Sequence, residues 1–197
     1  MQFDERLQMN SAISVKGSWD DGIIIDKYNE SSVYLGDDVF GHPQFRNTYT
    51  KIGELLHAMK YNGHFDTSKE IADICVSELA EWFSSKKIDI ILPAPPTADR
   101  ISQPVYMIAE AIAFKLNIPY SDEVLLKTDR HFSKNMPKDA KALKGCIVKL
   151  KDARRKCNVL LIDDFYSTGE TANECVSVLK KDPLIENVYY LAIAKTK

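Results

Sequence analysis

The sequence has little of what marks disulfide-rich, metal-binding or membrane-spanning proteins. Four of its 197 residues are cysteine, and no two of them form the Cys-x-x-Cys pair of zinc ribbons and redox motifs. The four histidines are scattered without the spacing of metal ligands. No stretch reaches the roughly 18 consecutive apolar residues that a membrane-spanning helix needs. These absences leave an ordinary folded domain whose chemistry depends on other residue types.

The charge of the chain also excludes two classes of partner. A formal charge of −2 at pH 7 creates no global field that would attract nucleic acid or an anionic membrane, so we expect neither partner. Residues 1–6 carry acids and no apolar run, so we expect no signal peptide and a cytoplasmic location. The oligomeric state stays open, a homodimer included.

A chain of this length is expected to form one domain, or one domain with a small appendage. Strand patterns at 22–28 and 32–36, separated by a turn at 29–31, predict a β-hairpin, and residues 37–47 predict a loop. We therefore expect an N-terminal hairpin and hood segment over 1–48 and an α/β domain over 49–197.

Helical and strand patterns alternate beyond residue 48. A 3.6-residue apolar period predicts helices over 49–60 (capped by Thr50), 67–84 (capped by Thr67 or Ser68), 103–116 and 170–181. Apolar runs predict strands, and these cover 88–93, 119–126, 145–150, 158–162 and 187–194. Such alternation implies an α/β fold with a parallel sheet flanked by helices and right-handed crossovers.

The most informative run spans residues 159–171. Four apolar residues predict a buried strand, and Asp163 and Asp164 follow at its C-terminal end, where open α/β folds bind ligands. A small hydroxylated turn at 167–169 then opens a helix, and its N–H groups suit a phosphate. Ionised carboxylates only accept hydrogen bonds, so the acid pair suits ribose hydroxyls. The alternative is a structural acid pair before a helix that Thr168 or Thr171 caps.

This run resembles the phosphoribosyl pyrophosphate (PRPP) signature of type I phosphoribosyltransferases. The resemblance implies that family's parallel sheet, with Asp163 and Asp164 holding the ribose 2′- and 3′-hydroxyls. It also implies a cradle for the 5′-phosphate in the loop that follows. The residues of that cradle are Ser167, Thr168, Gly169, Glu170 and Thr171.

Two further segments look like other parts of that family's site. The proline-stiffened run after the 88–93 strand resembles the pyrophosphate loop, and its candidate residues are Ala94, Pro95 and Arg100. A rigid connection with an exposed arginine is the alternative. The basic segment that follows the predicted strand 119–126 resembles the flexible loop that closes over pyrophosphate, and its candidate residues are Lys127, Arg130 and Lys134. A solvated charged loop is the alternative there.

The order of these segments, with Met59-Lys60-Tyr61 after a helix, resembles the ComF-like group, which is associated with bacterial DNA uptake and repair. The chain lacks the N-terminal zinc-binding Cys cluster common in that group. Ser167 stands where purine-base phosphoribosyltransferases commonly carry an aspartate that contacts the base. Serine cannot replace that carboxylate as a proton acceptor, which argues against 6-oxopurine salvage.

The resemblance implies transfer of a 5-phosphoribosyl group from PRPP to an unidentified nitrogenous acceptor, with release of pyrophosphate. No direct metal motif is present, and Mg²⁺ would be held by Asp163, Asp164 and waters. A planar acceptor could stack on aromatic residues of the hood, namely Tyr34, Phe40, Phe45 and Tyr49. The alternative is a non-catalytic PRPP- or nucleotide-binding protein with a regulatory or competence-related role.

Overall fold

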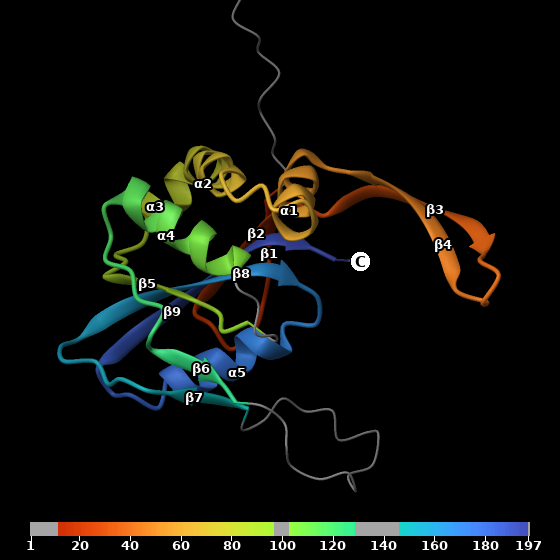
Figure 1. Ribbon diagram of the computed structural model, residues 1–197. Helices are drawn as coiled ribbons and strands as arrows, with labels where there is room; N and C mark the ends of the chain where they lie inside the picture. The colour runs from red at the N-terminus through yellow and green to blue at the C-terminus, as the bar shows by residue number, and fades with distance from the viewer. Residues whose placement is uncertain (1–11, 97–102, 129–145, 197) are drawn as a thin grey trace, which may run out of the picture.

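The computed structural model describes residues 12–96, 103–128 and 146–196, and a five-stranded sheet forms its centre (Figure 1). The strand order is β1-β2-β9-β8-β5. Four strands run parallel: β2 (Asp21–Lys27), β5 (Ile90–Pro93), β8 (Cys157–Tyr166) and β9 (Ile185–Lys195). β1 (Ile13–Ser14) pairs antiparallel with β2 at one edge. The predicted α/β fold with a mostly parallel sheet is confirmed.

Helices cover both faces of this sheet (Figure 1). One face packs against α1 (Lys51–Tyr61), α2 (Thr67–Glu78), α3 (Ala80–Ser84) and α4 (Pro104–Leu116). The other packs against α5 (Glu170–Leu179) and a ribbon of β6 (Leu125–Lys127) and β7 (Ile147–Lys149). Along β8, Leu160 and Ile162 enter the first core, whereas Val159 and Leu161 enter the second. Because successive residues enter opposite cores, all four positions from Val159 to Ile162 are apolar.

The start of α1 is fixed against the end of β2. Thr50 caps the helix, as predicted: its hydroxyl accepts from the Gly53 N–H at 3.0 Å and donates to the Lys27 carbonyl at 2.7 Å. A Cβ on Gly53 would lie 1.9 Å from the Tyr28 carbonyl oxygen, so only glycine allows this approach. Glycine has a low helix propensity, but Gly53 is needed where this helix and strand meet.

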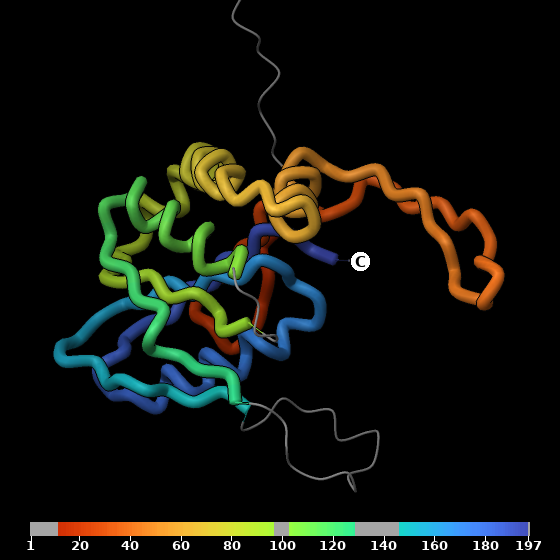
Figure 2. The backbone as a smooth tube through the Cα atoms, viewed as in Figure 1, coloured from red at the N-terminus to blue at the C-terminus, as the bar shows by residue number. Residues whose placement is uncertain are grey.

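Both strands of the predicted hairpin form, as β2 and as part of the next strand, but they do not pair with each other. β2 pairs parallel with β9, from Asp21↔Tyr189 to Lys27↔Lys195, so it belongs to the central sheet. The hairpin instead joins β3 (Asn29–Asp37), which contains the predicted strand 32–36, to β4 (Pro43–Tyr49), most of which lies in the predicted loop 37–47. β2 is apolar on both faces and requires cover, whereas β3 and β4 are largely exposed. Figure 2 shows this ribbon projecting from the body of the molecule.

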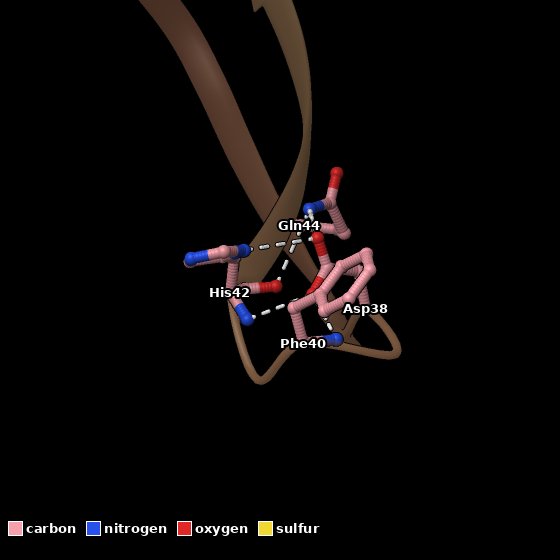
Figure 3. A network of polar contacts seen from close by, with 4 residues as sticks. All are labelled: Asp38, Phe40, His42 and Gln44. Atoms are coloured by element: carbon pink, nitrogen blue, oxygen red, sulfur yellow. Dashed lines mark hydrogen bonds and ion pairs between the residues drawn. The ribbon is translucent and has the colours of Figure 1, made fainter.

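One carboxylate organises the tip of that ribbon (Figure 3). Asp38 accepts from the backbone N–H groups of Phe40 at 2.8 Å and His42 at 2.9 Å. Its second oxygen lies 3.3 Å from the His42 ring and 3.4 Å from the Gln44 amide. These backbone hydrogen bonds lower the pKa of Asp38, and they define a turn where the chain has no core to support it.

Other boundaries also differ from expectation. The predicted helix over 67–84 divides into α2 and α3, and its N-cap is Asp66, without a side-chain capping bond. The predicted strand over 119–126 reduces to β6 and a single bridge between Tyr120 and Ile91. β8 continues four residues beyond the predicted end at Ile162. Across the described ranges, no helix is both long and apolar enough to cross a membrane.

Candidate ligand-binding site

The acid pair lies in the last part of β8, past the point where its neighbour β5 ends. Ile162 is the last β8 residue paired with β5, opposite Pro93, and its carbonyl accepts from the Ala94 N–H at 2.7 Å. On the other side β9 still pairs with β8, with Asp163 opposite Ala192. The strand therefore presents both carboxylates at the carboxyl edge of the sheet, with an open space on the β5 side.

A tight turn connects these acids to α5. Gly169 adopts φ +77°, and a Cβ there would lie 2.9 Å from the Tyr166 ring, so glycine is required on two counts. Gly169 is also the N-cap of α5, and no side chain caps the helix. Thr168 makes only a long 3.4 Å contact with the Glu170 N–H, and Thr171 lies inside the first turn. The alternative of a helix capped by Thr168 or Thr171 is therefore wrong.

Two cavities open beside these residues. The larger has a volume of about 310 Å³ and lies between β8, the segment after β5 and the start of α4. Its lining comprises Lys60, Ala94, Pro95, Pro96, Gln103, Pro104, Val105, Asp163, Asp164, Phe165 and Thr171. The smaller has a volume of about 160 Å³, and its lining comprises Asp163, Phe165, Ser167, Thr168, Gly169, Glu170, Thr171, Ala172 and Tyr190. Asp163, Phe165 and Thr171 line both, so the cavities adjoin.

Lys60 is a site residue that the sequence analysis did not single out as a ligand contact. Its ammonium lies 2.5 Å from the Asp164 carboxylate and 3.9 Å from the centre of the Phe165 ring. The Lys60 and Asp164 side chains are only 15% and 20% exposed, so water screens this ion pair weakly. Lys60 lies in the last turn of α1, which the Thr50 and Gly53 contacts hold against β2.

The Asp163 carboxyl is difficult to ionise. Its pKa is raised to about 7, first because the group is withdrawn from water and second because the Asp164 carboxylate lies beside it. The Lys60 charge opposes this rise. At neutral pH the acid pair therefore holds a proton for part of the time, and it can both donate and accept hydrogen bonds.

The remaining predicted residues fall into three groups. Ala94 and Pro95 are buried and line the larger cavity, beside the acid pair. Lys127 is half-buried at the end of β6 and lines neither cavity. Arg100, Arg130 and Lys134 lie outside the described residues.

The aromatic residues expected to form a hood do not line either cavity. Tyr34, Phe40 and Phe45 are exposed on the β3–β4 ribbon. Tyr49 instead packs against Tyr28, with ring centres 5.1 Å apart.

A preformed metal centre is absent from the described ranges, where no three His, Cys, Asp or Glu side chains form a cluster. Mg²⁺ commonly uses one or two carboxylates together with substrate phosphates and waters. Asp163 and Asp164, at the edge of the larger cavity, fit that minimal arrangement.

No protein-family model and no curated protein matches this chain. Among solved structures, adenine phosphoribosyltransferase from Leishmania tarentolae is 13% identical with a TM-score of 0.48, over 94% of each chain. The Trypanosoma brucei enzyme, in complex with AMP, pyrophosphate and ribose-5-phosphate, is 12% identical with a TM-score of 0.46, over 94% of this chain and 87% of that one.

Leishmania donovani UMP synthase is 19% identical with a TM-score of 0.38, over 81% of this chain. The chain spans only 27% of the length of that protein. Sequence identities and TM-scores this low describe only a distant likeness in the course of the backbone.

Proposed function

We propose that this protein is a PRPP-dependent phosphoribosyltransferase that acts on a nitrogenous acceptor. The observation that carries the proposal is the larger cavity, which brings the acid pair of β8 together with Ala94 and Pro95 after β5. These segments are about seventy residues apart in the sequence, and each resembles a different part of a PRPP site. Their meeting at the carboxyl edge of parallel strands is what a ligand site in an open α/β fold requires.

Each part of the site has a proposed role. Asp163 and Asp164 orient the ribose through its hydroxyls, and the turn 167–171 binds the 5′-phosphate in the smaller cavity. Pyrophosphate occupies the larger cavity beside Ala94 and Pro95, with Arg100 and the basic loop residues Arg130 and Lys134 as further proposed contacts. Anchoring the 5′-phosphate holds C1′ in place, so remote binding energy positions the reacting carbon.

The proposed reaction is a substitution at C1′. The acceptor nitrogen forms a bond to C1′ while the bond from C1′ to the pyrophosphate oxygen breaks, and the nitrogen then loses a proton to solvent. Ionised Asp163 and Asp164 stabilise positive charge that develops at C1′. Mg²⁺, held by these carboxylates and waters, would neutralise charge on the departing pyrophosphate.

The proposal extends to the acceptor site, the family subgroup and the oligomeric state. The segment over 1–48 is proposed as the acceptor hood of the PRPP-binding domain over 49–197, although the ribbon residues named above do not line the cavities. Membership of the ComF-like group rests on the order of motifs, including Met59-Lys60-Tyr61. A homodimer is part of the same proposal.

One observation favours a second candidate, a protein that binds PRPP without turning it over. Lys60 lies 2.5 Å from Asp164 and neutralises part of the negative charge that would stabilise positive charge at C1′. Incubation with PRPP, Mg²⁺ and a panel of bases, followed by measurement of released pyrophosphate, separates the two candidates. Release of pyrophosphate with one of the bases supports the transferase. Binding of PRPP without release of pyrophosphate on any base supports the protein that only binds PRPP.

The site itself is tested by replacing both acids. The double variant Asp163→Asn with Asp164→Asn should lose most of its affinity for PRPP and Mg²⁺ in calorimetry. Asp73→Asn is a suitable control, because Asp73 is exposed and pairs with Lys115 far from the cavities in sequence. An unchanged PRPP affinity in the double variant would contradict the ribose assignment.

A further inference from the structure

A third cavity, larger than the two beside the acid pair, lies at the opposite end of the sheet. Its volume is about 830 Å³, and it opens beside the first residues of three strands, which are Ile90 of β5, Cys157 of β8 and Ile185 of β9. Asp163 and Asp164, in contrast, lie near the carboxyl end of β8. No residue that lines this cavity lines either of the other two, so it is separate from the proposed PRPP site.

The chain leaves this space open where it departs from the edge of the sheet. β5 is an edge strand, and the segment that follows α4 meets it only at the bridge between Ile91 and Tyr120. There the Ile91 N–H donates to the Pro119 carbonyl at 2.8 Å, and the Ile91 carbonyl accepts from the Ser121 N–H at 3.2 Å. Beyond Ser121 the segment leads into β6, which pairs with β7 and not with β5. The cavity is lined by both this segment and β5, so it lies where the two separate.

Most of the lining is apolar. Leu92, Val159 and Leu179 belong to the second core and are at most 2% exposed, so they form the floor. The apolar side chains of the walls keep part of their surface exposed, and they belong to Ile90, Pro119, Val124, Cys157 and Ile185. A ligand can therefore reach the walls, and cavities of about 300–1,000 Å³ suit small organic molecules. An apolar body fits here, because its contact with the walls removes apolar surface of both from water.

Charged side chains also line the cavity, and the cations outnumber the acids. The cations are Lys151, Arg154 and Arg155, and the acids are Asp89 and Asp152. Both acids already have partners: Asp152 lies 2.7 Å from the Lys149 ammonium. Asp89 accepts from the backbone N–H of Asn158 at 2.9 Å. Lys151 is paired with Glu123, so its charge is compensated as well.

The two arginines are in a different position. Arg154 and Arg155 are exposed, and within the described ranges neither guanidinium forms an ion pair or a hydrogen bond. A guanidinium offers a planar set of donors that matches the oxygens of a carboxylate or phosphate. An uncompensated pair of them beside an apolar cavity is complementary to a ligand that is apolar at one end and anionic at the other.

We propose that this third cavity binds an amphipathic organic anion, whose apolar body contacts Ile90, Val124 and Cys157 and whose head group contacts Arg154 and Arg155. A neutral apolar molecule loses the head-group contacts, and an inorganic anion loses the apolar ones. The site lies at the other end of the sheet from the acid pair, so this inference is independent of the PRPP assignment. Failure of one leaves the other standing.

The test uses two fluorescent probes with the same rings. Anilinonaphthalene sulfonate carries one anionic group, and N-phenyl-naphthylamine lacks it. The double variant Arg154→Gln with Arg155→Gln should weaken binding of the sulfonate by about 10-fold, because each exposed charge contact contributes at most about fivefold. Binding of the neutral amine should stay the same. The control is Lys156→Gln with Lys180→Gln, which removes two exposed positive charges that do not line the cavity and should leave the affinity for both probes unchanged.

Alkylation of cysteine shows where the sulfonate binds. Cys157 and Cys146 are both half-buried, but only Cys157 lines the cavity. Burial, followed by the nearby Asp89 and Asp182 charges, raises the pKa of Cys157, so the reaction with iodoacetamide is followed at mildly alkaline pH. Saturating sulfonate should slow alkylation of Cys157 several-fold and leave that of Cys146 unchanged, measured by mass spectrometry of the peptides.

Several results would overturn the inference. One is a wild type that does not bind the sulfonate, and another is Cys157 that reacts equally fast with and without it. Equal weakening in the arginine and lysine variants would mean that the sulfonate responds only to overall charge. An equal loss for both probes in the arginine variant would remove the head-group contacts. The sulfonate should also raise the unfolding temperature, because it binds the folded state, and a lower temperature would show binding to unfolded chains instead.

Discussion

Replacing Lys60 with methionine tests whether α1 contributes to the site. The ammonium of Lys60 lies 2.5 Å from Asp164 and 3.9 Å from the centre of the Phe165 ring. Methionine has a similar length and can pack on the same ring, so the variant removes the charge while keeping most of the contact. Asp164 would then remain beside Asp163 without its cation.

The size of the effect follows from burial. Removing one partner of a fully buried ion pair costs about 3–5 kcal/mol, because the other charge stays behind without compensation. Lys60 and Asp164 keep 15% and 20% of their side-chain surface exposed, so water relieves part of that cost. We expect Lys60→Met to lower the free energy of unfolding by about 2 kcal/mol, and Lys60→Met with Asp164→Asn to lower it by less.

Urea unfolding at pH 7 measures this difference, and Lys115→Met is the matched control. Lys115 also lies 2.5 Å from a carboxylate, that of Asp73, but the two side chains are 30% and 65% exposed. An exposed pair contributes at most about 1 kcal/mol, so the control should change stability little.

The pH dependence of the Lys60→Met variant supplies a further check. Without Lys60 the acid pair binds its proton more tightly in the folded state, so the stability deficit should shrink as pH falls from 7 to 5. Equal losses in Lys60→Met and Lys115→Met, or a deficit that does not vary with pH, would refute the electrostatic reasoning.

Three further predictions concern the acid pair and two glycines. Because the pKa of Asp163 is raised to about 7, the folded state keeps this proton up to a higher pH than the unfolded chain does. The free energy of unfolding should therefore fall as pH rises from 5 to 7 and level off above 7. Asp163→Asn should flatten this profile, measured by urea unfolding at each pH. Gly169→Ala should lower the melting temperature more than Gly63→Ala, since both have positive φ but only Gly169 also faces a ring at 2.9 Å. Gly53→Ala should cost about 3 kcal/mol or more of unfolding free energy, measured by chemical denaturation, because its Cβ would lie 1.9 Å from a carbonyl oxygen.

Local sequence patterns predicted the fold class and the position of the acid pair. The apolar run before Asp163 predicted a strand buried on both faces, and β8 has that form. The glycine-containing turn and the amphipathic run after it predicted α5 in its observed place. These features depend on neighbours within a few residues, so a linear pattern is enough to show them.

Pairing between distant strands was harder to predict. A short turn between two strand patterns favours a hairpin, but β2 joins β9, more than 160 residues away, because its apolar residues require cover on both faces. A glycine within a helical pattern, such as Gly53, indicates by itself only a cost in helix propensity. The close carbonyl of Tyr28 is a tertiary contact that no local pattern encodes.

The site shows the same division. By itself the sequence determined that a strand, two carboxylates and a turn suited to bind phosphate follow one another, because that order is a property of adjacent residues. Only the tertiary structure decided that Lys60 pairs with Asp164 and that Tyr190, on a neighbouring strand, lines the cavity beside the turn. Both contacts join residues far apart in the chain, and packing of α1 and β9 against β8 brings them within reach. The sequence therefore determined which groups are available, and packing determined which of them meet.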